Sequence, residues 1–452
     1  MDNHYDVIVI GAGPGGEVCA AQLGKAGKRV AIIESELVGG ECAFWACVPS
    51  KVLLRSEDPY KESQRVPGSS SAVHGEPSFA QAAAWRDDSV SYYDDTEHLP
   101  FLRDNNVELI RGEAKVEQRG VVRVGSESFR YTTLVIATGS DPLMPPIPGL
   151  QDGRAWTPRD GTAVKRLPKR LAILGAGPVG VELGQFFARY GSAVTLIEPG
   201  DHVLAREERE VGVFMHDVLA ADGITLLTGK SANKVEWLRS GVRVSFGDGG
   251  PLEADELLVA AGRVGRSKNF DALALGMTLH KGSICVDEQC RAGEDVYAIG
   301  DVNGVALFTH VAKYQGRLAA DAILGKDTRA RYDAVPRCTF TDPEIGSTGM
   351  TEHQAQDQKI DYVTAKVDLT SAARGYLYYR DPARGFVKVV ADKQARTLLG
   401  ATIVGPMASE MVGIASTAIQ AKLRVDDLLQ IIQPFPTFSE AFFYALQALK
   451  WD

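Results

Sequence analysis

One sequence unit occurs twice along this chain of 452 residues. In each copy, an apolar run leads into a Gly-x-Gly-x-x-Gly turn, a helical pattern, a second apolar run and an acidic residue. The first copy has Gly11, Gly13, Gly16 and Glu34, and the second has Gly175, Gly177, Gly180 and Glu198. Because a chance repeat of these features at the same eighteen-residue offset is improbable, the sequence predicts two Rossmann-type units and two bound dinucleotides.

The glycines and the acid of each copy have separate roles in binding a dinucleotide. The first glycine permits a tight turn, the second lets a pyrophosphate approach the backbone, and the third lets helix and strand pack closely. The helix N-terminus then faces the phosphate charge. The terminal acid, Glu34 or Glu198, is placed to accept a hydrogen bond from a ribose hydroxyl.

The residues around Glu198 bear on the choice of nicotinamide cofactor. A carboxylate there suits the free 2′-hydroxyl of NADH and repels the 2′-phosphate of NADPH. No cation follows in the sequence before Arg206. We therefore expect NADH at the second unit and NADPH less readily.

Length and composition narrow the class of protein. The chain is long enough for about three domains, and its net charge of −9 offers no basic surface for nucleic acid. No apolar run approaches the roughly 18 residues that span a bilayer, and the N-terminus enters an apolar strand without a charged leader. We expect a cytoplasmic protein that binds neither nucleic acid nor membrane.

The six cysteines comprise one close pair and four others. Structural disulfides are disfavoured in a reducing cytosol. The four others are therefore expected to be buried thiols that act as small apolar residues: Cys19, Cys285, Cys290 and Cys338.

The close pair, Cys42 and Cys47, lies in the stretch GGECAFWACVPSK at 39–51. A redox disulfide, a metal site and two unrelated core thiols are all compatible with this spacing. Positions i and i+5 of a regular helix lie about 8.6 Å apart at Cα, beyond the roughly 7 Å limit for a disulfide. A bond between these cysteines therefore requires a distorted helical turn. Zinc is disfavoured because no close His pair accompanies these cysteines, and no metal site is predicted.

Three more segments fit a cofactor bound along both units. The stretch YTTLVIATGS (131–140) is an apolar strand that ends in a small turn, and DELLVAAGRVGR (255–266) repeats that design after the second unit. The stretch EDVYAIGDV (294–302) places Asp301 at the C-terminal end of a strand, where ligands gather in open α/β sheets.

With these features together, the sequence resembles the pyridine nucleotide–disulfide oxidoreductases, a family that includes dihydrolipoamide dehydrogenase, glutathione reductase and mercuric reductase. The resemblance implies FAD on the first unit, NAD(P)H on the second and a homodimer. The implied fold is α/β, with two Rossmann-type domains and a C-terminal α+β dimerisation domain. The expected segments are 1–150 (FAD, first part), 151–266 (NAD(P)H), 267–334 (FAD, central part) and 335–452 (interface).

The resemblance also assigns roles to single residues. The pattern C-x4-C-x-P-[ST]-K makes Cys42 the interchange thiol that meets substrate and Cys47 the charge-transfer thiolate against the flavin. Lys51 resembles the family lysine near the reactive flavin nitrogen, and Glu182 its ion-pair partner; a solvated lysine and a helix-surface glutamate are the plainer alternative. The helix at 308–320 resembles the one under the flavin. The remaining implied positions are Glu440 for catalysis, Ala114, Thr138, Gly139 and Asp301 with Lys51 for FAD, and Gly262 for NAD.

Two departures from the family pattern concern the acceptor. The C-terminal His-Pro-Thr-x-x-Glu signature reads here Phe435-Pro-Thr-Phe-Ser-Glu440, and no histidine follows His353. Phenylalanine cannot protonate a departing thiol, and general acid–base catalysis of this kind typically raises a reaction rate 10²–10⁴-fold. Between the cysteines, Phe44 and Trp45 replace small residues, with Glu41 where threonine is common; they serve either core packing or a stacking surface for a flat acceptor. Mercuric reductase also lacks this histidine, but its C-terminal vicinal cysteine pair is absent here.

These features favour an FAD-dependent oxidoreductase that passes electrons from NADH through flavin and a Cys42–Cys47 disulfide to a small-molecule acceptor. A quinone, a metal ion or an unusual thiol or sulfur species needs no histidine. The alternatives are a dihydrolipoamide dehydrogenase-like reductase for an unusual substrate and a redox-sensing flavoprotein. The stretch 56–79 is expected to be a loop, and 206–212 a solvated helix start.

Overall fold

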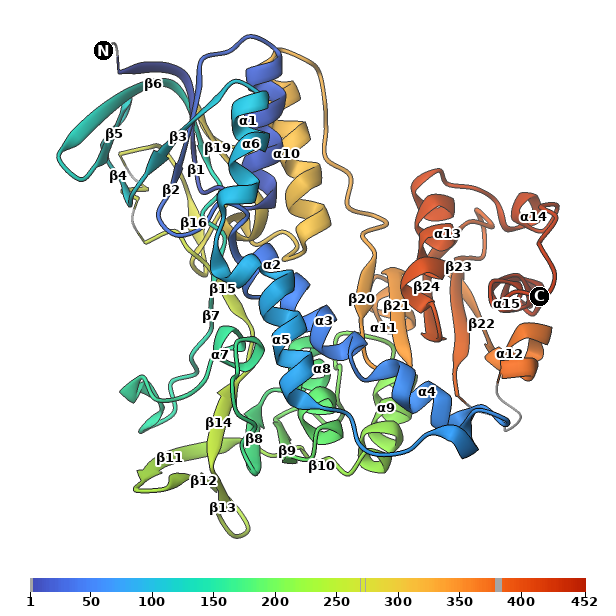
Figure 1. The fold of residues 1–452 in the computed structure, drawn as a ribbon. Helices are drawn as coiled ribbons and strands as arrows, with labels where there is room; N and C mark the ends of the chain where they lie inside the picture. Colours follow the sequence, from blue (N-terminus) through green and yellow to red (C-terminus); the bar gives the residue numbers. More distant parts are fainter. Residues whose placement is uncertain (1–2, 269, 273, 379–383) are drawn as a thin grey trace.

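The computed structural model describes residues 3–268, 270–272, 274–378 and 384–452. The chain forms three main sheets, and the second unit is inserted in sequence between the early strands of the first sheet and its last two, β18 and β19. In Figure 1 the C-terminal sheet, drawn in orange and red, lies to the right of the other two. The α/β class and both strand–turn–helix–strand units predicted from the sequence are confirmed. The four segment boundaries expected from the sequence stay a prediction. No helix within the described ranges is long and apolar enough to cross a membrane.

The first sheet has eight strands, ordered β18-β19-β6-β1-β2-β3 with the β4–β5 hairpin attached to β6. Its core strands are parallel and in register: Ile10 of β1 pairs with Ile33 of β2 and Ile136 of β6. Their carboxyl ends therefore meet at one edge. The strands are β1 (His4–Ile10), β2 (Val30–Glu34), β3 (Val107–Arg111), β4 (Ala114–Gln118), β5 (Val121–Val124), β6 (Glu127–Ile136), β18 (Arg291–Gly293) and β19 (Val296–Ala298).

The second unit has a four-stranded parallel sheet, β10-β9-β8-β14, and an antiparallel sheet of three strands, β11-β12-β13. Leu174 of β8 pairs with both Ile197 and Val259, so the ends of these strands are also aligned. The strands are β8 (Arg170–Leu174), β9 (Ala193–Glu198), β10 (Thr225–Thr228), β11 (Ala232–Leu238), β12 (Gly241–Phe246), β13 (Leu252–Ala254) and β14 (Glu256–Val259).

The C-terminal sheet is antiparallel and has five strands, in the order β20-β21-β24-β23-β22. These strands are β20 (Arg337–Thr339), β21 (Glu344–Gly349), β22 (Tyr362–Asp368), β23 (Phe386–Asp392) and β24 (Leu398–Gly405). Two short pairs complete the strands: β7 (Ser140–Pro142) with β15 (Arg263–Gly265), and β16 (Leu279–His280) with β17 (Ser283–Ile284).

Helices cover the sheets and connect the units. In Figure 1 the early helix α1 lies beside the late helix α10, although about 300 residues separate them in the chain. The helices are α1 (Pro14–Lys25), α2 (Gly40–Phe44), α3 (Cys47–Arg55), α4 (Asp58–Arg65), α5 (Phe79–Ser89), α6 (Leu99–Asp104), α7 (Pro158–Thr162), α8 (Pro178–Arg189), α9 (Arg209–Ala221), α10 (Thr309–Ile323), α11 (Glu352–Asp357), α12 (Ala373–Tyr378), α13 (Ala408–Gln420), α14 (Val425–Leu428) and α15 (Glu440–Gln447).

Of two local predictions, the loop is wrong, and the solvated helix start is confirmed as a helix start, since α9 begins at Arg209, but not as solvated throughout. The expected loop at 56–79 contains α4 and a 3₁₀ turn at Ser70–Ala72; α4 is held because Arg65 forms an ion pair with Asp342 of the C-terminal part. The stretch 206–212 is not simply solvated, since Glu208 is only 4% exposed and its carboxylate bonds Lys388 at 2.9 Å. In both cases an ion pair with a residue distant in the sequence explains the difference from the prediction.

Candidate active site

The two glycine turns have the geometry that a dinucleotide requires. An added Cβ at Gly11 lies 2.4 Å from a carbonyl oxygen, and one at Gly16 lies 2.0 Å from the Gly11 oxygen, so backbone packing excludes any larger residue. At Gly13, by contrast, a Cβ meets nothing within 4 Å. The second unit repeats this pattern at its three glycines, with open space only at Gly177. The open position is the one where a diphosphate approaches the backbone.

The turn of the first unit opens into a cavity of ≈ 750 Å³ at the carboxyl ends of β1 and β2. Its size and its open glycine cradle fit FAD. The cavity brings together most of the positions predicted for flavin binding and catalysis. They are Gly11, Gly13, Gly16, Glu34, Cys42, Cys47, Lys51, Ala114, Thr138, Gly139, Glu182 and Asp301.

Other predicted positions lie outside this cavity. Gly175, Gly177 and Gly180 form the second turn, where Glu198 accepts hydrogen bonds from the amides of Ala176 (2.9 Å) and Gly200 (2.8 Å). Glu34 does the same in the first unit, with the amides of Ala12 (2.7 Å) and Glu36 (2.8 Å). Gly262 has a φ of 122°, and its carbonyl accepts from the Leu143 amide at 2.9 Å. Glu440 belongs to the C-terminal part.

The segment with the two cysteines is broken as predicted. Helix α2 ends at Phe44 and α3 begins at Cys47, with Trp45 and Ala46 between them. Ala46 has φ −123° and ψ −90°, outside the helical region. This break replaces the regular helical turn that would hold the two cysteines too far apart to bond.

Hydrogen bonds and charge separate the properties of the two thiols. The hydrogen bond from Cys42 is the largest influence and, helped by Thr309 and Lys51, it lowers the pKa of Cys47 to about 6, although burial opposes the shift. The Cys47 Sγ lies 3.3 Å from Thr309 Oγ1, at the start of α10. The pKa of Cys42 rises, first through its hydrogen bond to Cys47 and then through burial. In the reduced state one proton is thus held on Cys42, and Cys47 is the thiolate.

Lys51 and Glu182 form the predicted ion pair, with 2.8 Å between Nζ and Oε2. The Glu182 side chain is only 7% exposed and also accepts the Phe340 amide at 2.8 Å. The Lys51 ammonium lies 4.7 Å from the centre of the Phe340 ring. A surface location for the glutamate is therefore excluded, and the pair joins α3, α8 and the C-terminal sheet.

The C-terminal signature divides into a buried and an exposed part. Glu440 is 7% exposed and accepts the Thr437 amide at 3.0 Å, whereas the Phe435 side chain is 75% exposed. Ile432 beside it is 95% exposed. This surface is apolar and carries no proton donor at the position of the family histidine.

One prediction for the four other cysteines is wrong. Cys19 and Cys290 are fully buried, but Cys285 is exposed because it follows the short strand β17, whose Ile284 takes the inward position. Cys338 is half-buried and lines the flavin cavity, a placement that its sequence context did not signal. Burial, the largest influence, raises the pKa of Cys338 to about 11.

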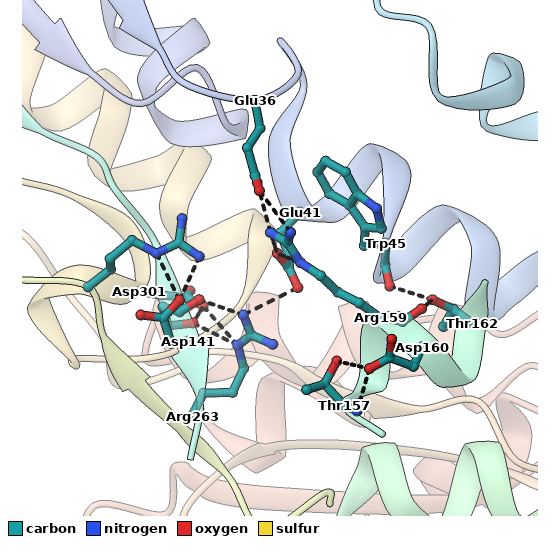
Figure 2. Close-up of polar contacts among 12 residues, drawn as sticks. Glu36, Glu41, Trp45, Asp141, Thr157, Arg159, Asp160, Thr162, Arg263 and Asp301 are labelled. Carbon is teal, nitrogen blue, oxygen red and sulfur yellow. Dashed lines mark hydrogen bonds and ion pairs between the residues drawn. The ribbon is translucent and has the colours of Figure 1, made fainter. Parts of the chain in front are cut away.

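A network of charges in the cavity wall was also missed (Figure 2). Arg159 Nε donates to Glu41 at 2.8 Å, and its two terminal nitrogens reach Glu36 at 3.2 and 3.1 Å. Arg263 Nη2 lies 3.4 Å from Glu41, and its Nε lies 3.9 Å from Asp301. No motif surrounds Arg159 in the sequence, since it belongs to the connection between the two units.

Two family models together match most of the chain. The family model described as pyridine nucleotide-disulphide oxidoreductase matches residues 5–316, and that of its dimerisation domain matches 335–446. The chain belongs to the pyridine nucleotide-disulphide oxidoreductase family. Members of this family are FAD-dependent enzymes that use a pyridine nucleotide, and the dimerisation domain supports a homodimer.

The relatives carry different names. A dihydrolipoyl dehydrogenase from Geobacillus stearothermophilus is 32% identical, over 96% of this chain and 94% of that protein. A mercuric reductase from Staphylococcus aureus is 31% identical, over 100% of this chain and 83% of that protein. The structure is similar to the Cu(II) complex of the HOCl-induced flavoprotein disulfide reductase RclA from Escherichia coli, with a TM-score of 0.87 and 26% identity over 99% of this chain and 100% of that one.

Proposed function

We propose that this family member takes electrons from NADH and passes them, through FAD and the Cys42–Cys47 pair, to an acceptor that needs no proton from the enzyme. The observation that carries the proposal is the exposed, apolar Phe435 next to the retained, buried Glu440. The family signature is present at this surface except for its one acid–base group. An acceptor that requires protonation of a leaving thiol loses that assistance, whereas a quinone or a metal ion does not need it.

The residues of the first unit support the electron path. When bound, FAD takes up a hydride from nicotinamide and passes on the electron pair. The Cys42–Cys47 disulfide would accept the electron pair and one proton, and its bond would break to give a thiolate and a thiol. Cys47 is placed to carry the thiolate, because Cys42 and Thr309 both hydrogen-bond to it. Cys42 retains the proton. Both thiols are half-buried, and the family resemblance assigns the role of the thiol that meets the acceptor to Cys42.

The second unit supports NADH as the donor. Glu198 ends β9, and its carboxylate is held by two backbone amides at the edge of the glycine turn. A carboxylate in this position favours a free ribose hydroxyl and disfavours a phosphate.

The names of the relatives bear on the acceptor. A mercuric reductase and a copper complex of a disulfide reductase both point to thiophilic metal ions. In the described part of the chain, no group of three or more His, Cys, Asp or Glu side chains could hold a metal. A metal acceptor would therefore have to react at the cysteine pair itself. Dihydrolipoyl dehydrogenase is the second candidate, favoured by its name among the relatives and opposed by Phe435.

An anaerobic titration of the enzyme with NADH tests the electron path. The proposal expects uptake of two electron pairs per protomer and a long-wavelength charge-transfer absorbance. Uptake of a single pair with simple bleaching would contradict a role for the cysteines. The Cys42→Ser variant then separates acceptors: turnover is lost for those that react at the dithiol and retained for those, such as quinones, that react at the flavin alone.

A further inference from the structure

The residue before the first cysteine brings a negative charge close to the diphosphate turn. The Gly39 amide donates to the Ala12 oxygen at 2.8 Å, and a Cβ on Gly40 would lie 2.9 Å from the Gly13 Cα. The segment is thus packed directly on the open glycine of the cradle. Glu41 follows at once and lines the same cavity.

The cavity is acidic even before a cofactor enters it. Among the described residues that line it there are six carboxylates and four cations. One cation, Lys51, is already paired with Glu182. A dinucleotide adds two negative charges from its diphosphate, so Glu41 and Glu36 need to be neutralised if the cofactor is to bind.

Arg159 contacts both of these carboxylates. It reaches Glu41 through Nε and Glu36 through its two terminal nitrogens, a geometry that a planar guanidinium allows and an ammonium does not (Figure 2). Burial opposes the charge of Arg159, but hydrogen bonds to Glu41 and Glu36 outweigh burial and raise its pKa. The side chain is 26% exposed and lines the flavin cavity.

The arginine is also fixed in position by the cysteine segment. Its guanidinium carbon lies 4.2 Å from the centre of the Trp45 ring, a cation–π contact. On the same short helix, α7, Thr162 Oγ1 donates to the Trp45 carbonyl at 2.8 Å (Figure 2). Trp45 therefore holds the guanidinium from one side while Glu36 and Glu41 hold it from the other.

We propose that Arg159 is a flavin-retaining residue, whose positive charge offsets part of the negative charge of Glu36 and Glu41 beside the diphosphate turn. The connection between the two units thereby contributes to cofactor binding, which neither glycine turn indicates. This inference concerns the affinity for FAD and is independent of the electron acceptor.

The test measures release of FAD from the holoenzyme on dilution, followed by flavin fluorescence. Arg159→Gln is expected to raise the dissociation constant at least tenfold, and the double variant Arg159→Gln/Glu41→Gln to recover part of that loss, since Glu36 stays charged. Arg166→Gln, at an exposed arginine of the same connection, is the matched control and should stay within twofold of the original protein. The inference would be overturned if Arg159→Gln raised the FAD dissociation constant less than tenfold. It would also be overturned if removing Glu41 as well recovered none of the lost affinity.

A variant that leaves Arg159 intact covers the case in which Arg159→Gln does not fold. Glu41→Gln removes one negative charge from the cavity and leaves Arg159 held by Glu36 and Trp45, so FAD affinity is expected to stay the same or increase. Weakening beyond threefold would show that Glu41 itself serves the cofactor and would overturn the proposed role of Arg159.

Discussion

Lys51 of α3 and Glu182 of α8 lie 2.8 Å apart and join the cysteine helix of the first unit to the glycine helix of the second. The residues next to Lys51 or Glu182 in the sequence do not by themselves indicate that the two side chains meet. Their charges act on Cys47 with opposite signs, because Lys51 lowers the pKa of that thiol and Glu182 raises it. The two charges of the ion pair therefore adjust the pKa of Cys47, which the hydrogen bond from Cys42 influences most.

The first prediction concerns the opposite effects of Lys51 and Glu182 on the pKa of Cys47. The pKa of Cys47 is lowered to about 6, which favours the thiolate over the thiol at pH 7 in the reduced protein. Lys51→Met should raise the pKa of Cys47, and Glu182→Gln should lower it. The measurement is a pH titration of the thiolate absorbance in the reduced enzyme. A shift in the same direction for both variants would contradict the assignment.

The second prediction restores the missing acid–base group. Phe435 is 75% exposed in the single protomer, so Phe435→His removes little packing within the protomer and should change the protomer's free energy of unfolding by no more than about 0.5 kcal/mol. Turnover with a disulfide such as lipoamide should rise by roughly 100- to 1,000-fold, within the range that general acid–base catalysis supplies. Turnover with a quinone should stay within about twofold, since that reaction needs no such group.

Phe435→Ala is the control for this experiment. It removes the ring without adding a proton donor, so disulfide turnover should not rise. An equal gain in the alanine variant would mean that the phenylalanine merely obstructs the site, and the proposed reason for its effect would be wrong.

The third prediction concerns the charge cluster that joins α9 to the C-terminal sheet. Lys388 is 3% exposed and lies 2.9 Å from Glu208, 2.7 Å from Glu210 and 2.6 Å from Glu352. Breaking a buried ion pair typically costs about 3–5 kcal/mol, because the remaining charge is left uncompensated. Lys388→Met should therefore lower the thermal unfolding temperature, and Lys388→Met/Glu208→Gln should recover part of the loss. A single variant as stable as the original would contradict this account.

The parts that the sequence predicts are those determined locally by the backbone. A glycine with φ of 103° whose Cβ would meet a carbonyl at 2.4 Å, as at Gly11, allows no other residue, and the turn repeats at Gly175. The break between α2 and α3 follows in the same way, because a regular helix would keep the two cysteines too far apart to bond.

The parts that the sequence does not predict are long-range pairings of charge. Arg159 lies 118 positions from Glu41, and Lys388 lies 180 positions from Glu208. The residues around a charged side chain in the sequence do not indicate which distant residue it will pair with. Glu208 is therefore interpreted from the sequence as a solvated residue. The same holds for α4, which Arg65 holds through Asp342.

The last prediction uses a third cluster of this kind. Glu57 has a side chain 3% exposed, and its Oε2 accepts from Arg189 at 2.9 Å. Arg189 also pairs with Asp222 and Asp342, so its charge is shared among three carboxylates. Glu57 Oε1 is buried and has no hydrogen-bond partner among the described residues. Burial is the largest influence and raises the pKa of Glu57 to about 7.

A raised carboxyl pKa makes folding favour the protonated form. The stability that Glu57 contributes is therefore fully present below about pH 4.3, the pKa of an unfolded glutamate, and is lost progressively as the pH rises to about 7. Glu57→Gln stays neutral at every pH. Its free energy of unfolding should therefore fall less between pH 5 and pH 8 than that of the original protein. Urea unfolding at both pH values measures this difference, and an equal pH dependence in the two proteins would show that Glu57 is ionised throughout.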